Sequence, residues 1–264
     1  MRKLIVNADD FGFTRDVNQG ILQAHQQGIL TATTLMANGP AFADAVRLAK
    51  ENPTLDIGCH LVLVGDPPFP PTLAQLVPAV MLGRIRIYEE LSVQVRRIQD
   101  AGLTPTHLDT HKHTHLLPQV LDAVARISQE FGIPWVRRPF DFPGQPGGVG
   151  WTSRLMQLGS GWSRTALARR GCRSTDWFAG FGITGDYDAA TLSTLIRALP
   201  EGSTEFMCHP GVCGADLRAA PTRLKESREA ELRALTSVEV REAVNQAGVE
   251  LVNYVDLGRA QNRH

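Results

Sequence analysis

The sequence has 264 residues, 43% of them hydrophobic, with 27 basic and 27 acidic residues and a formal net charge of zero at pH 7. That length suits one large core, and an α/β barrel of this size is commonly a single domain, so we expect residues 1–264 to form one domain. The balanced charge excludes the strongly basic surface typical of proteins that bind nucleic acids or anionic membranes.

The first quarter of the chain alternates between strand-like and helical patterns. A short apolar run at residues 4–6 predicts a buried strand, which is followed by two adjacent carboxylates, Asp9 and Asp10. Thr14 can cap a helix that Gly28 ends. We then expect a strand at 31–37, a helix at 41–50, a strand at 56–64 that contains His60, a proline-rich loop at 65–78 and a helix at 88–101.

Residues 107–115 read H-L-D-T-H-K-H-T-H and contain four of the eight histidines of the chain. The T-P-T before this stretch and the L-L-P after it favour a strand that runs into a loop. Alternate residues of a strand share one face, so one side would carry His107, Asp109, His111, His113 and His115. A helix, in which residues four apart align, and a surface histidine-rich tract are the alternatives.

The alternation continues to the end of the chain. After residue 117 we expect helices at 118–131, 151–170, 189–199, 223–235 and 238–247, strands at 134–139, 177–183, 204–209 and 250–255, and a loop at 140–150. About eight repeats of strand and helix predict a parallel sheet with helices outside it. A closed barrel is favoured over an open doubly wound sheet, because no G-x-G-x-x-G follows the first strand.

Cysteine usage and hydropathy bear on location. The four cysteines have no paired C-x-x-C spacing, which favours reduced thiols in the cytoplasm. The apolar run at the N-terminus is too short for a signal peptide, and no stretch approaches the length of a membrane span. We therefore expect a cytoplasmic protein without a transmembrane segment or a nucleic-acid partner, and a homodimer stays open.

Five side chains with metal-binding or acid–base chemistry lie in or just after predicted strands: Asp9, Asp10, His60, His111 and His209. Each alone has a plain structural explanation as a turn, cap or core residue. In a parallel barrel the carboxyl ends of the strands meet at one face, so together they predict a site.

One aspartate and two histidines form a three-ligand metal set that leaves positions open for water and substrate. A second carboxylate can act as general base and a further histidine as general acid. These residues predict a metal-dependent hydrolase of an amide or ester. A phosphoester hydrolase with two metals and a metal-binding module without catalysis are the alternatives. G-x-S-x-G and the P-loop motif are absent.

Several sequence blocks occur in order between residue 3 and about residue 256: N-A-D-D-F-G, T-A-T-T-L-M-A-N-G, G-C-H-L-V-L-V, T-H-L-D-T-H-K-H-T-H, E-F-M-C-H-P-G and, near 228–237, R-E-A-E-L-R-A-L-T-S. These blocks resemble the YdjC-like carbohydrate deacetylases. The resemblance implies a distorted (β/α) barrel of the TIM-like type, related to polysaccharide deacetylases. It also implies hydrolysis of the N-acetyl group of an N-acetylglucosamine-type sugar, either a chitooligosaccharide or a glycolipid such as an N-acetylglucosaminyl hopanoid.

The resemblance also implies roles for individual residues. Asp9 resembles the general base, and His209 resembles the general acid. Asp10, His60 and His111 resemble the ligands of one divalent metal ion. Two histidines and one aspartate suit Zn²⁺ or another transition metal, whereas members of the family are often described with Mg²⁺.

Two adjacent arginines and three residues of the histidine-rich stretch have less defined roles. Arg137 is expected to orient the base or to bind the developing oxyanion, although Arg138 is an alternative for the same role. Asp109, His113, His115 and Arg138 are candidates for substrate binding or for support of the ligands. Asp109 is close enough in sequence to accept a hydrogen bond from a ligating histidine.

Overall fold

The structure is a computed structural model that describes residues 1–65, 68–145, 157 and 159–261. At its centre lies a parallel sheet with the strand order β5-β4-β3-β2-β1-β7-β6, and β8 pairs with β1 outside this path. The strands are β1 (Arg2–Phe11), β2 (Ala32–Leu35), β3 (Asp56–Leu61), β4 (His107–Thr110), β5 (Trp135–Val136), β6 (Trp177–Ala179), β7 (Gly202–Cys208) and β8 (Val249–Leu251).

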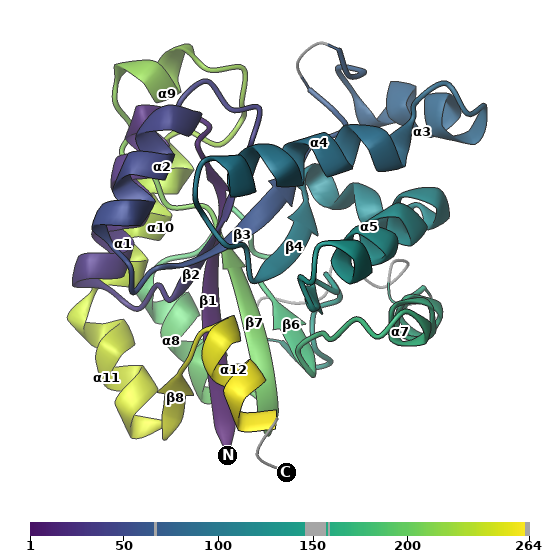
Figure 1. The fold of residues 1–264 in the computed structure, drawn as a ribbon. Coiled ribbons are helices and arrows are strands. Elements are labelled where there is room, and N and C mark those ends of the chain that lie inside the picture. The colour runs from purple at the N-terminus through teal and green to yellow at the C-terminus, as the bar shows by residue number, and fades with distance from the viewer. Residues whose placement is uncertain (66–67, 146–156, 158, 262–264) are drawn as a thin grey trace.

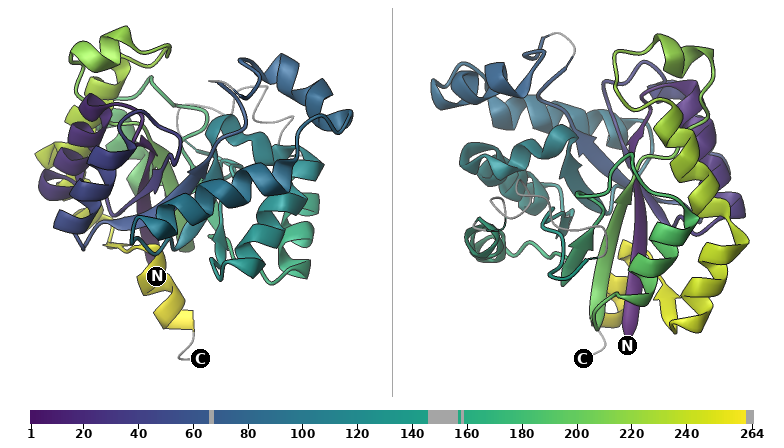
Figure 2. Two further views of the ribbon diagram at one scale, coloured as in Figure 1. Left: turned by 45° about the horizontal axis from the view of Figure 1, so that its top comes forward. Right: turned by 180° about the vertical axis from the view of Figure 1, so that it is seen from behind.

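Helices cover the sheet in two groups (Figure 1). On one side lie α1 (Arg15–Gln27), α2 (Phe42–Glu51), α8 (Ala189–Arg197), α10 (Glu226–Thr236) and α11 (Val238–Gln246). On the other side lie α4 (Ile87–Asp100), α5 (Pro118–Glu130) and α7 (Ser160–Arg169), which Figure 2 shows from two further directions. One end of α4 meets the first group, where Arg97 lies over the ring of Phe42 of α2. The remaining helices are α3 (Leu73–Met81), the 3₁₀ helix η1 (His111–Leu116), α9 (Ala215–Ala219) and α12 (Tyr254–Gln261).

The sheet curls into a distorted barrel, as expected. Its edge strands, β5 and β6, do not pair along their length. Isolated parallel bridges join Trp135 to Arg173 and Asp141 to Phe178, so the segments around the two edges close the curl. The barrel therefore has the predicted parallel architecture with an irregular seam.

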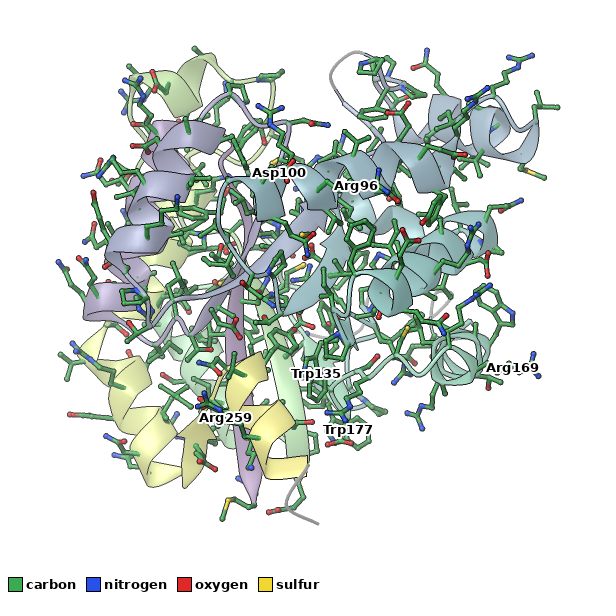
Figure 3. The ribbon with its side chains drawn as sticks, viewed as in Figure 1. Arg96, Asp100, Trp135, Arg169, Trp177 and Arg259 are labelled. Atoms are coloured by element: carbon green, nitrogen blue, oxygen red, sulfur yellow. The ribbon has the colours of Figure 1, made fainter. Side chains whose placement is uncertain are left out.

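The end of the barrel at the amino termini of the strands, which is the lower end in Figure 1, is closed by a small apolar cluster. Ile5, Trp135, Tyr254 and Leu257 are buried in it together with neighbouring aliphatic side chains. Figure 3 shows Trp135 at this end, close to α12. Polar side chains also reach this end, because His107 stacks on Tyr254 and Asp56 accepts a hydrogen bond from the backbone N–H of Tyr254.

The structure corrects several expectations from the sequence. The strand expected at 107–115 ends at Thr110, because Lys112 and His113 adopt left-handed φ angles of 53° and 52° and the chain turns into η1. The strand expected at 250–255 is cut short, because Asn253 Oδ1 accepts a hydrogen bond from the backbone N–H of Asp256 and starts α12. The loop expected at 65–78 contains the start of α3.

The helix expected at 151–170 begins in a stretch, 151–156 and 158, that lies outside the described residues, and the later part of the expected helix is α7. Among the described helices, none combines the length and the apolar character that crossing a membrane requires.

Candidate active site

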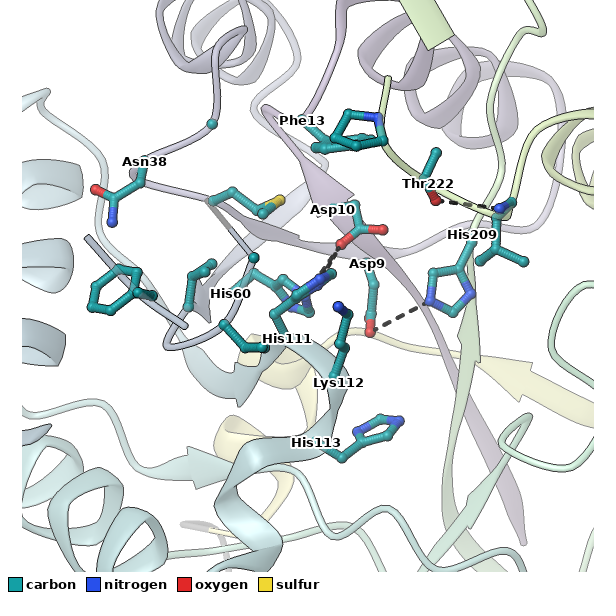
Figure 4. Close-up of a pocket in the computed structure, with 18 of the residues that line it drawn as sticks. Asp9, Asp10, Phe13, Asn38, His60, His111, Lys112, His113, His209 and Thr222 are labelled. Carbon is teal, nitrogen blue, oxygen red and sulfur yellow. Dashed lines mark hydrogen bonds and ion pairs between the residues drawn. The ribbon is translucent and has the colours of Figure 1, made fainter. Parts of the chain in front are cut away.

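A cavity of about 980 Å³ lies at the carboxyl ends of the strands. Asp9, Asp10, His60, His111 and His209 line it, and Figure 4 shows them around one central space. They come from β1, β3, the start of η1 and the end of β7. The structure therefore brings together the five side chains that the sequence singled out.

A β-bulge places both carboxylates of β1 on the same side. The pairing of β1 with β2 shifts register between Ala8 and Phe11, and Asp10 has a φ of 69°. Neighbouring residues of a regular strand point to opposite faces, whereas a bulge re-aims one of them. A left-handed φ is unfavourable for an aspartate, so contacts of the Asp10 side chain must hold this conformation.

Asp10, His60 and His111 form a compact set of donor atoms. Asp10 Oδ1 lies 3.3 Å from His60 Nε2 and 3.2 Å from His111 Nδ1, and the two nitrogens are 3.2 Å apart. A cation bound at about 2.0–2.1 Å to each donor in tetrahedral geometry would set such donors about 3.3 Å apart. Asp10 Oδ1 is buried and has no hydrogen-bond donor among the described residues, so this set fits a metal ion.

Asp109 fixes the orientation of His60. His60 Nδ1 lies 2.7 Å from Asp109 Oδ1, and the hydroxyl of Thr34 donates to Asp109 Oδ2 at 3.1 Å. When Nδ1 donates its proton to Asp109, Nε2 is the ring nitrogen that faces the donor set and could bind a cation in place of a proton. Burial lowers the pKa of His60, but the carboxylates of Asp109 and Asp10 raise it to about 10. The same negative charge favours a bound cation.

Arg137 holds Asp9 at two points. Its Nη1 and Nη2 donate to the two oxygens of Asp9 at 2.7 Å each, and it also contacts Asp109 at 2.6 Å and Glu205 at 2.6 Å. Burial raises the pKa of Asp9, but the charge and hydrogen bonds of Arg137, together with His60 and His209, hold the pKa well below its usual range. Asp9 is therefore ionised and fixed in orientation.

The side chains of the two adjacent arginines, Arg137 and Arg138, lie in different surroundings. Arg137 is buried beside Asp9, whereas Arg138 donates to the carbonyl oxygen of Ser160 at 3.4 Å and is absent from the described residues that line the cavity. The structure therefore does not bring Arg138 into the site, in contrast to the expectation that it supports the site or binds substrate.

His113 and His115 lie on different sides of the turn after β4. His113 lines the cavity, and its ring lies 5.3 Å from that of Phe181. In the described part of the chain, its Nδ1 has no hydrogen-bond partner. His115 is buried outside the cavity lining, with Nδ1 2.6 Å from the hydroxyl oxygen of Thr110. Burial lowers the pKa of His115 to about 3 and also lowers that of His113. His113 can therefore contact a ligand, whereas His115 supports the turn.

His209 faces Asp9 from the end of β7. Its Nε2 lies 3.9 Å from Asp9 Oδ2, and Figure 4 shows it across from His60 and His111. The side chain is 11% exposed, and burial lowers its pKa below the ordinary value. A lowered pKa in a group beside a carboxylate is typical of residues that exchange protons during catalysis.

Three charged residues around the site are not indicated by the sequence patterns that point to the other site residues. Glu205 on β7 binds Arg137, Arg228 on α10 binds Asp10 Oδ2, and Glu231 on α10 accepts a hydrogen bond from the backbone N–H of His209. Arg228 and Glu231 belong to the R-E-A-E-L-R block. A spacing of three residues places both on one helix face among apolar residues, and this pattern could have indicated that they are buried.

Comparison with known proteins gives full-length matches. The family model described as YdjC-like protein matches residues 3–246. A carbohydrate deacetylase of Brevibacillus brevis is 32% identical over 97% of this chain and 100% of its own length. A carbohydrate deacetylase of Geobacillus stearothermophilus is 35% identical over 96% of this chain and 97% of its own length.

A solved structure agrees with these matches. A protein of Enterococcus faecalis V583, described as a candidate cellobiose-phosphate cleavage protein, superposes with a TM-score of 0.76 at 26% identity, covering 97% of this chain and 98% of its own. The match of the family model over most of the chain, together with these relatives, shows that the chain belongs to the family of YdjC-like proteins.

Proposed function

We propose that this protein is a metal-dependent deacetylase that hydrolyses the N-acetyl group of an acetylated amino sugar. The names of its relatives support the reaction, since two full-length relatives are carbohydrate deacetylases. The observation that carries the proposal is the three-donor set of Asp10, His60 and His111, with Asp9 and His209 facing each other beside it.

The donor set supports one divalent ion. Two imidazole nitrogens and one carboxylate oxygen suit Zn²⁺ and related transition metals, whereas Mg²⁺ prefers oxygen ligands. We therefore propose Zn²⁺ over Mg²⁺ for the ion held by Asp10, His60 and His111. When bound, such an ion supplies positive charge that polarises a carbonyl group and favours ionisation of water.

The side chains around the ion supply the proton transfers. Asp9, held ionised by Arg137, accepts a proton from the water that attacks the acetyl carbonyl carbon. The protonated form of His209 donates its proton to the amide nitrogen as the C–N bond breaks. The products are acetate and the free amino sugar, so the reaction consumes one water and needs no other reactant.

The cavity wall facing β3 and α3 supports a substrate with an apolar group. Val62, Val64, Phe69, Leu73 and Val93 line that wall. The amide of Gln94, a polar group in the same region, is engaged by the backbone N–H and carbonyl oxygen of Val62 at 2.8 Å each. Such a wall offers few hydrogen bonds to sugar hydroxyls, so we propose a glycolipid rather than a chitooligosaccharide.

The phosphoester alternative needs a second metal ion. A second set of possible ligands, Asp9, His60 and Asp109, exists among the described residues. Arg137 contacts both carboxylates of that set, and its positive charge opposes a cation there. A metal-binding module without catalysis gives no reason for the Asp9–Arg137 pair or for His209. Both alternatives therefore fit the site less well.

Release of acetate from a panel of N-acetylated amino sugars tests the proposal. The protein is first stripped of metal with a chelator and then assayed with Zn²⁺ or Mg²⁺ added back. We expect release that depends on added metal and is fastest with N-acetylglucosamine carrying a long alkyl aglycone. Hydrolysis of a phosphoester panel without acetate release would contradict it. The cytoplasm remains the proposed location, because the four cysteines are free thiols.

A further inference from the structure

Helix α10 carries two charged side chains into the core beside the site. Arg228 and Glu231 are 2% and 1% exposed, although they lie on a helix whose other charged residues face outward. Three residues apart on a helix, they share one face. Charged side chains are almost never fully buried unless they are paired. The groups that pair with Arg228 and Glu231 therefore indicate the role of this helix face.

Arg228 holds the metal-ligand candidate of β1. Its Nη2 donates to Asp10 Oδ2, and its Nε donates to the carbonyl oxygen of Leu224 at 3.3 Å. With Oδ2 occupied, Oδ1 is the oxygen of Asp10 that faces His60 and His111. Arg228 therefore determines which oxygen of Asp10 points at His60 and His111. Its hydrogen bond also helps to hold Asp10 in the unfavourable left-handed conformation.

Glu231 holds the backbone at His209. Its Oε2 accepts hydrogen bonds from the His209 N–H at 2.5 Å and from the Tyr187 hydroxyl at 3.1 Å. Its Oε1 accepts from the Gly185 N–H at 2.8 Å. The carbonyl oxygen of Arg228 also accepts from the N–H of Gly211, two residues after His209. The loop after β7 is thus tied to α10 at two places.

We propose that Arg228 and Glu231 are positioning residues, through which α10 sets the metal ligand Asp10 and the acid His209 relative to each other. The inference rests on the proposed function. Both residues act indirectly. Arg228 acts through the carboxylate of Asp10, and Glu231 acts through the backbone of His209. Because the two residues contact different groups, we expect replacement of Arg228 and replacement of Glu231 to cause different defects.

Titration of the metal-stripped protein with Zn²⁺ alone tests Arg228. Loss of a partner that orients a ligand weakens metal affinity by about 10- to 100-fold, and we expect this for Arg228→Gln. Arg228→Lys keeps the charge and one donor, so its Zn²⁺ affinity should lie between those of the wild type and Arg228→Gln. Arg233→Gln is the matched control, because Arg233 lies on the same helix with its side chain 69% exposed, and it should bind as the wild type does.

The sign of the effect separates positioning from simple charge balance. If Arg228 only neutralised Asp10, its removal would leave more negative charge at the site and tighten Zn²⁺ binding. Tighter or unchanged binding by Arg228→Gln would overturn the role of Arg228. This readout needs no turnover, so it is independent of the substrate.

Leaving-group dependence tests Glu231. The amide of Glu231→Gln must direct an NH₂ group at a backbone N–H, either that of His209 or that of Gly185, and this displaces one of them. We expect at least about a tenfold loss of kcat on the N-acetyl substrate, a smaller loss on an activated acetyl ester and unchanged Zn²⁺ affinity. Tyr187→Phe removes a different hydrogen bond to Glu231 and should keep kcat.

Equal losses on amide and ester, or no loss, would overturn the role of Glu231. Glu231→Asp, which keeps the charge on a shorter side chain, gives the same comparison if Glu231→Gln does not fold. The proposed function fails separately, when the wild-type protein binds no metal ion or releases no acetate.

Discussion

Replacing Asp9 by asparagine separates the base from the metal ligand beside it. Asp9 accepts two hydrogen bonds from Arg137 at 2.7 Å and one from Asn7 at 3.1 Å. Asparagine keeps the size but directs an NH₂ group at one of these donors, which costs about 1–3 kcal/mol when the clash stays buried. Arg137 keeps Asp109 and Glu205 as partners, so we expect the variant to fold.

The effect on catalysis is expected to be larger than the effect on folding. A positioned general base contributes about 100- to 10,000-fold to the rate, and a loss of that size raises the barrier by about 3–5 kcal/mol. The metal ion should stay, because the donor set contains Asp10 and not Asp9. Acetate release and metal content are measured on the same preparation, with thermal unfolding as the check of folding.

Asp10→Asn is the matched variant, and it should lose metal affinity because the donor oxygen changes. If Asp9→Asn lost the metal and Asp10→Asn kept it, the roles of the two carboxylates would be reversed. A kcat for Asp9→Asn within about tenfold of the wild-type value would show that Asp9 is not the base.

Three further predictions concern single residues. His209→Ala should lower kcat by about 100- to 10,000-fold on the amide, and less on an activated ester, with metal content unchanged. An acid must be protonated to act, and burial lowers the pKa of His209. Wild-type activity should therefore decline with rising pH from a lower pH than an ordinary histidine gives, and the variant should lack that decline. Gly58→Ala should destabilise the protein by about 1–3 kcal/mol in denaturant unfolding, because a Cβ there would lie 2.6 Å from the ring of His107; an unchanged midpoint would contradict this packing. Burial raises the pKa of Asp56 to about 6, so the folded state binds this proton more tightly than the unfolded chain does. Wild-type stability relative to Asp56→Asn should fall by about 3 kcal/mol as pH rises from about 4 to 6 and then level off; a parallel pH dependence in both proteins would refute the assignment.

The barrel and the meeting of the five site residues could be predicted from sequence, because both follow from local patterns. Alternating apolar runs and helical periods identify the strands and helices one at a time. Once the sheet is parallel, the carboxyl ends of its strands share one face, so Asp9, His60 and His209 are expected together without knowledge of any contact.

The path of the histidine-rich stretch could not be predicted by the same means. Strand periodicity placed five side chains on one face, yet the alternation stops at Thr110. The left-handed residues Lys112 and His113 carry no glycine or asparagine signal. The turn is held by Thr110 Oγ1, which accepts a hydrogen bond from the backbone N–H of His115 at 3.1 Å. A turn held by one side-chain hydrogen bond leaves no trace in the strand periodicity of the sequence.

The arginines of the site illustrate a second limit. Arg137 and Arg138 are adjacent, and which one faces the interior depends on the register of the two-residue strand β5. Arg228 comes from a helix more than two hundred positions along the chain from Asp10. The sequence block that contains it was visible, but the pairing depends on how α10 packs against β1, which is a tertiary property.

The metal content of His60→Ala tests the central claim most directly. His60 supplies one donor nitrogen through Nε2, while its Nδ1 contacts Asp109 and Thr34. After equilibration with Zn²⁺ and dialysis, we predict one bound ion for each wild-type chain and a loss of most of that metal in the folded variant, together with acetate release. A variant that kept the wild-type metal content would contradict the account.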